Sequence, residues 1–237
     1  IARCLDSVKD IADEIIVVDS FSTDKTESIC NQYNLRFIKN PFKGHIEQKN
    51  FALALAQHDY VLSLDADEAL SSELLLEIRK VKEDFQYDGY RFNRLTNYNG
   101  HWVNYCGWYP DTKLRLIKKS LAHWTGTNPH DILEMKNSSK VAFLKGDLLH
   151  YSYTSIASHI NQTDKFTTIA ARAAFAQGKK SSLVKIYTRP FLKFFRDYFF
   201  KRGFLDGHYG LIICSINALS ALLKYAKLYD LQKGKKI

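Results

Sequence analysis

The chain has 237 residues, 46% of them hydrophobic and 25% charged, which is typical of a folded globular protein and excludes a disordered one. Its length suits one large domain, or one domain with an appendage. Its formal net charge is +9, which points to nucleic acid or an anionic membrane as a partner. The four cysteines form no Cys-x-x-Cys pair, so we expect reduced thiols in a cytosolic compartment and neither a zinc site nor a disulfide framework.

Apolar residues recur at helical spacing over residues 1–11, so the chain opens on a helix, and we expect a strand to precede it. Residues 14–18 (EIIVV) predict a buried strand, followed at once by Asp19 and a loop rich in Ser, Thr and Asp. Ser22 and Asp24 can cap the helix that follows, which leaves Asp19 without a structural role. A carboxylate at the carboxyl end of a buried parallel strand can accept a hydrogen bond from a ligand, such as the imide N–H of uracil.

Residues 35–39 predict a short strand, and residues 44–57 predict a helix with polar residues near its start, among them Lys49. The apolar run at residues 60–64 predicts a buried strand of a parallel sheet. The alternation of helix and strand up to this point indicates a Rossmann-like α/β unit with parallel strands.

The run YVLSLDADE at residues 60–68 ends in three carboxylates. Asp65 and Asp67, separated by the small Ala66, are expected at the carboxyl-terminal edge of the sheet, where α/β proteins hold their ligands. Two carboxylates at this spacing can converge on one hard divalent cation such as Mg²⁺ or Mn²⁺. A solvated acidic turn before the next helix is the alternative.

After a helix predicted over residues 71–85, the pattern changes. Residues 89–98 alternate like an exposed strand, and Asn99-Gly100 is a strong hairpin signal. Further strands are expected at residues 113–118 and 148–153. These strands predict a mixed or antiparallel extension of the sheet.

From residue 155 onward the chain has a helical pattern. The expected helices cover residues 155–177, residues 184–202 with an interruption at Pro190, and residues 206–229. The apolar run at residues 210–223 is shorter than the roughly 20 residues that a spanning helix needs, so we expect it to be packed or interfacial. Two domains follow from this pattern, residues 1–154 and residues 155–237.

Residues 185–237 carry eleven Lys or Arg against three Asp, a net charge of +8 that accounts for nearly all of the excess. Cations mixed with aromatic residues can face nucleic acid or an anionic membrane, or can simply form solvated helix faces. No nucleic-acid module is recognisable, and the aromatic cluster FFRDYFF lies on a predicted helix rather than on a sheet. We therefore expect an anionic membrane surface as a partner, and no nucleic acid.

Four motifs occur in order along the chain: IIVVDSFSTDKT, QKNFALALAQHDYVLSLDADE, GWYPDTKLRL and NPHDIL. In these motifs the sequence resembles the family 2 glycosyltransferases of GT-A fold, and among them the lipopolysaccharide-core β-glucosyltransferase subgroup. The resemblance covers essentially the whole chain. It implies an α/β, Rossmann-like GT-A domain over residues 1–154, lacking its N-terminal strand, with a mixed, mainly parallel sheet flanked by helices. Residues 155–237 are then a helical C-terminal extension.

The resemblance implies an inverting enzyme that moves glucose or another hexose from a nucleotide-sugar donor, with a UDP-sugar favoured. The implied acceptor is lipopolysaccharide core or another glycolipid or polysaccharide, and the implied location is cytoplasmic, peripheral on the inner face of the cytoplasmic membrane. Such a transfer needs a divalent ion to neutralise the departing diphosphate and a carboxylate to take the proton of the attacking hydroxyl. Two alternatives stay open: a polyprenyl-phosphate sugar transferase of the same fold, and a basic nucleic-acid-binding protein.

Residue by residue, the resemblance implies a role for each matching position. Asp131 is the implied general base, although it stands in Pro129-His130-Asp131 where the subgroup usually has Val-His-Glu, and a stray loop acid is its alternative. Nucleotide-sugar binding is implied for Asp19, Ser22, Asp24, Lys49 and Asp65. Divalent metal binding, Mg²⁺ or Mn²⁺, is implied for Asp67, Asp65 and His150. Acceptor or diphosphate binding is assigned to Arg115, Trp108 and His130.

Each of the more weakly matched residues has a structural alternative. His150 suits a core or capping position equally well. Arg115 can form a surface ion pair, and Trp108 can belong simply to the hydrophobic core.

Overall fold

The computed structural model describes residues 1–127 and 130–237, without the side chains of Thr127 and His130. The chain divides into two compact units. The first consists of Ile1–Arg94 and Asp111–His150, and the second of Leu95–Pro110 and Tyr151–Ile237. The helical second unit thus contains a segment, Leu95–Pro110, that the sequence pattern places in the first domain.

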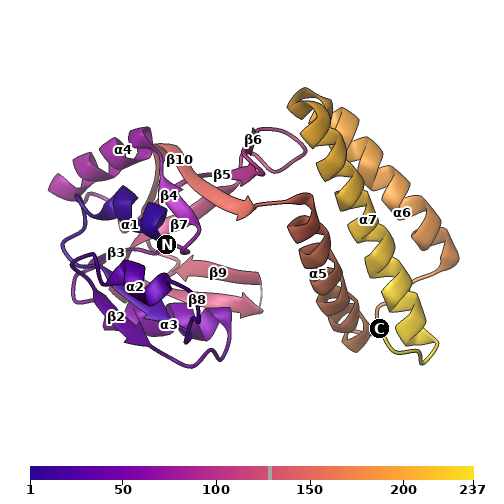
Figure 1. The fold of residues 1–237 in the computed structure, drawn as a ribbon, viewed down its shortest axis with the longest axis horizontal. Coiled ribbons are helices and arrows are strands. Elements are labelled where there is room, and N and C mark those ends of the chain that lie inside the picture. The colour runs from indigo at the N-terminus through magenta and orange to yellow at the C-terminus, as the bar shows by residue number, and fades with distance from the viewer. Residues whose placement is uncertain (128–129) are drawn as a thin grey trace. The chain divides into compact units, whose positions relative to one another are not determined.

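The elements of the first unit follow the expected order of helices and strands (Figure 1). Its helices are α1 (Ala2–Val8), α2 (Thr26–Cys30), α3 (His45–Leu55), α4 (Ser72–Glu83) and the short 3-10 helix η1 (Lys119–Leu121). Its strands are β1 (Ile16–Asp19), β2 (Arg36–Lys39), β3 (Tyr60–Leu62), β4 (Glu68–Leu70), β7 (Thr112–Lys118), β8 (Ala122–Thr127), β9 (His130–Met135) and the first parts of β5 (Gly89–Tyr98) and β10 (Val141–Tyr153).

These strands form a mixed arrangement, which confirms the expected α/β class. β1 and β2 pair in parallel, β8 and β9 form an antiparallel hairpin, and the six-stranded sheet has the order β3-β7-β5-β10-β4 with β6 (His101–Val103) beside β5. The pairing of residues 60–64 differs from the expectation of a parallel sheet, because β3 pairs antiparallel with β7. An apolar strand sequence shows that both faces are covered, but it does not specify the direction of a partner that lies some fifty residues later.

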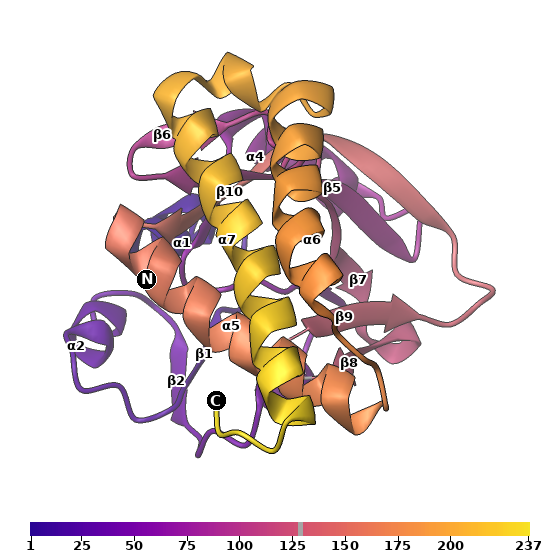
Figure 2. The ribbon, with the colours of Figure 1, turned by 90° about the vertical axis from the view of Figure 1, so that its right-hand side faces the viewer.

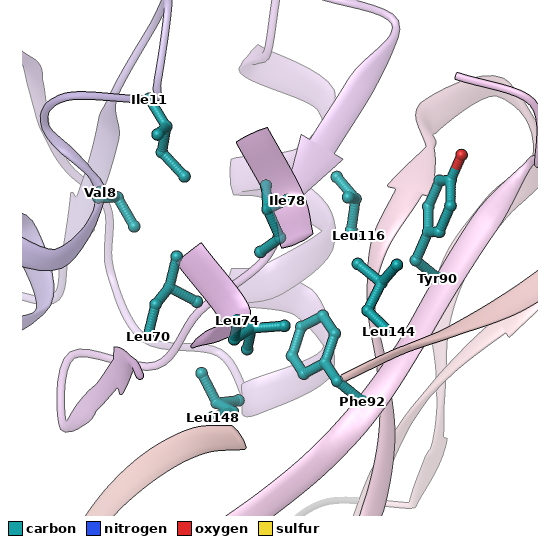
Figure 3. Close-up of a cluster of buried hydrophobic side chains, with 10 residues drawn as sticks. All are labelled: Val8, Ile11, Leu70, Leu74, Ile78, Tyr90, Phe92, Leu116, Leu144 and Leu148. Atoms are coloured by element: carbon teal, nitrogen blue, oxygen red, sulfur yellow. The ribbon is translucent and has the colours of Figure 1, made fainter. Parts of the chain in front are cut away.

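The main core of the first unit gathers side chains from α1, α4 and the sheet (Figure 3). Figure 3 shows Leu74 and Ile78 of α4 close to Phe92 and Leu116 of the strands. Each such burial stabilises the fold by about 1.5–3 kcal/mol. The hydroxyl of Ser71 caps α4 by accepting from the backbone N–H of Leu74, and it also accepts from the N–H of Asp147 in β10. This core therefore holds β4, β7 and β10 in the positions from which the site described below is built.

The second unit is built on three long helices, α5 (Ile156–Ala176), α6 (Leu183–Phe195) and α7 (Gly207–Gln232). Figures 1 and 2 both show α5 and α6 running alongside α7, in agreement with the contacts between them. A π-helical turn, η2 (Arg196–Phe200), and a 3-10 turn, η3 (Gly203–Asp206), join α6 to α7. Ser155 and Ser182 cap the starts of α5 and α6.

Pro190 does not interrupt its helix, contrary to the expectation from the sequence. Proline cannot donate to the carbonyl four residues earlier and usually kinks a helix. Here α6 continues through Pro190 to Phe195 and packs along α7, and the irregularity follows at the π-helical turn instead.

Within the described part of the chain, one helical segment is long and apolar enough to cross a membrane by length and composition, Gly203–Gln232. The core helix of a soluble protein can meet the same criterion but is mostly buried, whereas 22% of the most apolar window of Gly203–Gln232 is buried. Ile213 and Cys214 of this segment belong to a buried cluster. All four cysteines of the chain are free and buried.

His159 of α5 lies in an aromatic cluster of the second unit. Its Nδ1 is 3.2 Å from the hydroxyl oxygen of Tyr98. The ring centres of Tyr153, Tyr98 and Trp108 lie between 4.4 and 5.6 Å from that of His159. Burial lowers the pKa of His159 to about 4, so its imidazole is neutral at pH 7 in the folded protein.

Acid should therefore destabilise the protein through His159. In the unfolded chain this group has an ordinary pKa of about 6.5, so the unfolded state binds more protons as the pH falls from about 6.5 toward 4. We expect its contribution to the free energy of unfolding to fall by about 2 kcal/mol between pH 7 and pH 5. Urea unfolding at both pH values should show a smaller loss for His159→Phe than for the parent. An equal loss in the two proteins would assign the acid sensitivity to other groups.

Candidate active site

Lys49 of α3 stands between two of the predicted carboxylates. Its Nζ lies 2.8 Å from Asp65 Oδ1 and 2.8 Å from Asp131 Oδ2. Asp65 follows β3, whereas Asp131 lies on β9, 82 residues after Lys49 in the sequence. The fold therefore brings Asp65, expected on the donor side, and Asp131, expected to act as the base, to the same ammonium group.

The β8–β9 hairpin reaches Lys49 because it is anchored on α3 at the next residue. The side chain of Asn50 donates to the carbonyl of Trp124, and the backbone N–H of Trp124 donates back to the Asn50 Oδ1, at 2.8 and 2.9 Å. Trp124 also packs with Leu53 of α3 and Leu133 of β9. This pair of hydrogen bonds fixes the hairpin, and with it Asp131, relative to the helix.

Arg115 of β7 joins Asp65 to a buried glutamate. Its Nη2 donates to Asp65 Oδ2 at 3.2 Å and to Glu68 Oε1 at 2.9 Å, and the other oxygen of Glu68 accepts from the N–H of Asp65. Only 4% of Arg115 and 1% of Glu68 are exposed, so the alternative of a surface ion pair for Arg115 is wrong. Removing one partner of a buried pair of this kind typically costs about 3–5 kcal/mol.

The charge state of Asp65 follows from these contacts. Burial by itself would raise the pKa of the Asp65 carboxyl, but the Arg115 guanidinium and the Lys49 ammonium outweigh it and hold this pKa at about 2. Asp65 is therefore ionised at neutral pH, with its oxygens already engaged by two cations.

Asp67 takes a different partner from Asp65. Its side chain is 50% exposed, and its Oδ2 lies 3.3 Å from Nε2 of His150 on β10. The other ring nitrogen of His150, Nδ1, is buried and has no hydrogen-bond partner among the described residues. In the part of the chain that the structure describes, no three His, Cys, Asp or Glu side chains are grouped to hold a metal ion.

A carboxylate and an imidazole side by side nevertheless fit a divalent ion. Mg²⁺ commonly takes only one or two protein ligands and completes its shell with water and substrate phosphates, and Mn²⁺ accepts the same oxygen ligands. Asp67 and His150 would hold the ion, while Asp65, already paired with Lys49 and Arg115, fits a supporting position.

The loop after β1 is held by its own side chains. Asp19 is buried and accepts hydrogen bonds from both the backbone N–H and the hydroxyl of Ser22. Asp24 is exposed and accepts from the N–H of Thr26 at the start of α2, which is the capping role open to it from the sequence. Asp19 therefore has a structural role in this loop, contrary to the expectation from the sequence.

Trp108 and His130 are the two remaining residues predicted to bind the acceptor or the diphosphate. Trp108 belongs to the second unit, where its ring packs against Tyr98, Tyr153 and His159. The side chain of His130 lies outside the described part of the chain, as do residues 128 and 129 of the NPHDIL motif.

Sequence reasoning missed Glu68 and Asn50 as well as a neighbouring ion pair between Arg94 and Asp111, whose Nη2 and Oδ2 are 2.8 Å apart. The sequence did contain a signal for Glu68, because a carboxylate at the start of a short apolar strand must find a buried partner. The sequence contained no such signal for Asn50, Arg94 and Asp111, because their partners come from distant parts of the chain.

Comparison with known proteins gives the following matches. The profile of glycosyl transferase family 2 matches residues 1–132. An uncharacterized glycosyltransferase of Rickettsia prowazekii is 34% identical over 248 residues, which cover 98% of this chain and 82% of the relative. The lipopolysaccharide core biosynthesis glycosyltransferase LpsC of Rhizobium meliloti is 28% identical over 244 residues, and the match covers 97% of this chain and 87% of the relative. The crystal structure of S. aureus TarS 1-349 in complex with UDP matches with a TM-score of 0.45 and 14% identity, and the match covers 99% of this chain and 88% of the TarS chain.

Proposed function

The chain belongs to glycosyl transferase family 2, and from this premise we propose an inverting transfer of a hexose from a UDP-sugar to a lipopolysaccharide-core or related glycolipid acceptor. The observation that carries the proposal is the position of Lys49, whose Nζ lies 2.8 Å from both Asp65 and Asp131. An inverting enzyme needs a donor site and a catalytic base next to each other, and these two carboxylates fit the two sides. The name of the relative LpsC supports the choice of acceptor.

In the proposed reaction, Asp131 accepts the proton of the acceptor hydroxyl as that oxygen attacks the anomeric carbon of the donor. The bond from the anomeric carbon to the phosphate oxygen breaks, and the nucleoside diphosphate leaves with the electron pair. Lys49 holds the carboxylate of Asp131 in place and contributes positive charge beside the donor. Asp19 and the loop that carries Ser22 and Asp24 bind the nucleotide.

A divalent ion, held by Asp67 and His150, would neutralise the charge of the leaving diphosphate. The direct test of the proposed function is a titration of the protein with UDP- and GDP-sugars, with and without Mg²⁺ or Mn²⁺. We expect metal-dependent binding of a UDP-sugar. Absence of binding by any nucleotide sugar with either metal would contradict the proposal.

The long apolar segment Gly203–Gln232 favours one second candidate, a polyprenyl-phosphate sugar transferase. Enzymes of that kind share the donor site and differ in the acceptor and in the way they meet the membrane. Release of UDP that depends on added polyprenyl phosphate, rather than on a lipopolysaccharide acceptor, would select this candidate.

We further propose that the enzyme is cytoplasmic and binds the inner face of the membrane through one side of α6. Val184, Tyr187, Phe191 and Phe195 of α6 recur every three or four residues and are all exposed, and Phe199 of η2, also exposed, lies next to Phe195, so the five form one apolar stripe. α6 also packs on α7. An exposed aromatic stripe beside cations suits the headgroup region of an anionic bilayer.

The structure divides the aromatic residues and cations of residues 191–202 into two groups. Phe194 and Tyr198 pack on a buried cluster. Lys193 and Arg196 are ion-paired with the buried Asp197, at 2.7 and 2.8 Å. These cations therefore stabilise the fold, and others must carry the membrane attraction.

Arg189, Lys201 and Arg202 are the cations to test. The parent should pellet with anionic vesicles at low salt, be released as salt screens the charges, and not pellet with neutral vesicles. Each cation near the surface is worth about 1 kcal/mol, so changing these three to Gln should weaken binding roughly 10²-fold.

The matched control changes Lys25, Lys136 and Lys145 of the first unit to Gln, which removes the same charge from other exposed positions. This control should pellet like the parent. Equal loss in both variants would indicate attraction by net charge alone, and a parent that never pellets would exclude the membrane surface.

A further inference from the structure

A polar cavity of about 560 Å³ opens beside Asp131. β5 and β7 supply one part of its wall and the β8–β9 hairpin another. Lys49 and Asp65 also line it, whereas Asp19, Asp67 and His150 do not. The cavity therefore adjoins the proposed base and reaches Lys49 and Asp65 on the donor side, but it does not include Asp19, Asp67 or His150.

Two buried side chains in its wall carry hydrogen-bond donors without a partner among the described residues. The ion pairs of Arg115 with Asp65 and Glu68 both use Nη2, and its Nε and Nη1 are buried without a partner among the described residues. Trp124 is 4% exposed, and its Nε1 is also buried without such a partner. An unsatisfied buried donor costs about 1–3 kcal/mol, so a ligand that supplies acceptor oxygens here would be favoured.

The wall on β5 and β7 is rich in cations. Arg91 is exposed and has no ion pair among the described residues, while Arg94 and Lys113 share the carboxylate of Asp111, at 2.8 and 2.9 Å, and Arg94 Nη1 also lies 3.6 Å from Glu68 Oε1. Among the charged residues that line the cavity, five cations stand against the two carboxylates of Asp65 and Asp131, so the lining carries a net positive charge. Arginine is particularly suited to phosphate and carboxylate groups, because its planar donors match their oxygens.

We propose that this cavity binds an anionic group, phosphate or carboxylate, of the acceptor, so that the molecule receiving the sugar is itself negatively charged near its reactive hydroxyl. The proposal rests on the proposed function, since it takes Asp131 as the base at the cavity's edge. Anchoring the anion on Arg91, Lys113 and the free donors of Arg115 would place a nearby hydroxyl of the same molecule at Asp131.

Simple sugars can test this without knowledge of the natural acceptor. The protein, saturated with UDP and Mg²⁺, is titrated with glucose 1-phosphate, with glucuronate and with neutral glucose, which separates phosphate from carboxylate and both from the sugar alone. We expect at least one anionic sugar to bind at least tenfold more tightly than glucose. In the double variant Arg91→Gln/Lys113→Gln this binding should weaken at least tenfold, while UDP affinity stays unchanged.

Arg79→Gln, an exposed arginine of α4 outside the cavity, is the matched control and should bind like the parent. Equal binding of all three sugars, or full binding by the double variant, would overturn the proposal. Anion binding that saturating UDP abolishes would assign the cavity to the donor's diphosphate and would overturn it as well. If UDP does not bind, the proposed function fails, and the same titration of the free protein decides the anion site by itself.

Discussion

Replacing Asp131 with Asn is expected to lower kcat about 10²- to 10⁴-fold, the usual contribution of a general base. The amide has nearly the same shape as the carboxylate, and its oxygen can still accept from Lys49, which lies 2.8 Å away in the parent. The hairpin should stay in place, because Asn50 and Trp124 anchor it independently. Donor affinity should therefore change little, and the loss should fall on the chemical step.

A control variant separates a base from a merely structural residue. Asp131→Glu keeps a carboxylate and should retain far more activity than Asp131→Asn. A loss in kcat of less than tenfold would transfer the role to another carboxylate, with Glu134 on the same strand the next candidate.

The residues at the ends of the early strands could be predicted from the sequence, because the signals there are local. Apolar runs end at Asp19 and shortly before Asp65, and strands β1 and β3 do end close to those positions. The family is confirmed by the matches to known proteins. The proposed roles of the individual carboxylates stay predictions.

The assembly of the site could not be predicted, because it depends on contacts between distant segments. Lys49 meets Asp131 only because Asn50 binds Trp124, 74 residues later. Arg115 is buried because β7 lies between β3 and β5 in the sheet, and strand order of this kind leaves no mark on a single strand.

The helical unit shows the same division between local and distant signals. Helix starts were predictable, because Ser155 and Ser182 are ordinary capping residues. The inclusion of Leu95–Pro110 in the helical unit could not be predicted, because it depends on Asp206. The carboxylate of Asp206 accepts hydrogen bonds from the backbone N–H groups of Asn104 and Tyr105, about a hundred residues away in the sequence.

Replacing Asp67 with Ala should abolish metal-dependent binding of the donor and lower turnover about 10³-fold, since a bound ion contributes several kcal/mol of charge stabilisation. The fold should survive, because Asp67 is half exposed and, among the described residues, its side chain pairs with His150. Calorimetric titration of UDP with and without Mg²⁺ or Mn²⁺ measures the effect. A chelator should reduce the parent to the level of the variant and leave the variant unchanged.

Asp10→Ala, which removes an exposed carboxylate just after α1, is the matched control and should bind donor and metal like the parent. His150→Ala should weaken metal binding less than Asp67→Ala, because the carboxylate that carries the charge remains. Asp65→Ala differs from both, since it removes a partner of Lys49 and of the buried Arg115 and so should also lower the melting temperature. If Asp67→Ala binds and turns over the donor as the parent does, the ion is not held at Asp67, and Asp65 becomes the carboxylate to examine for it.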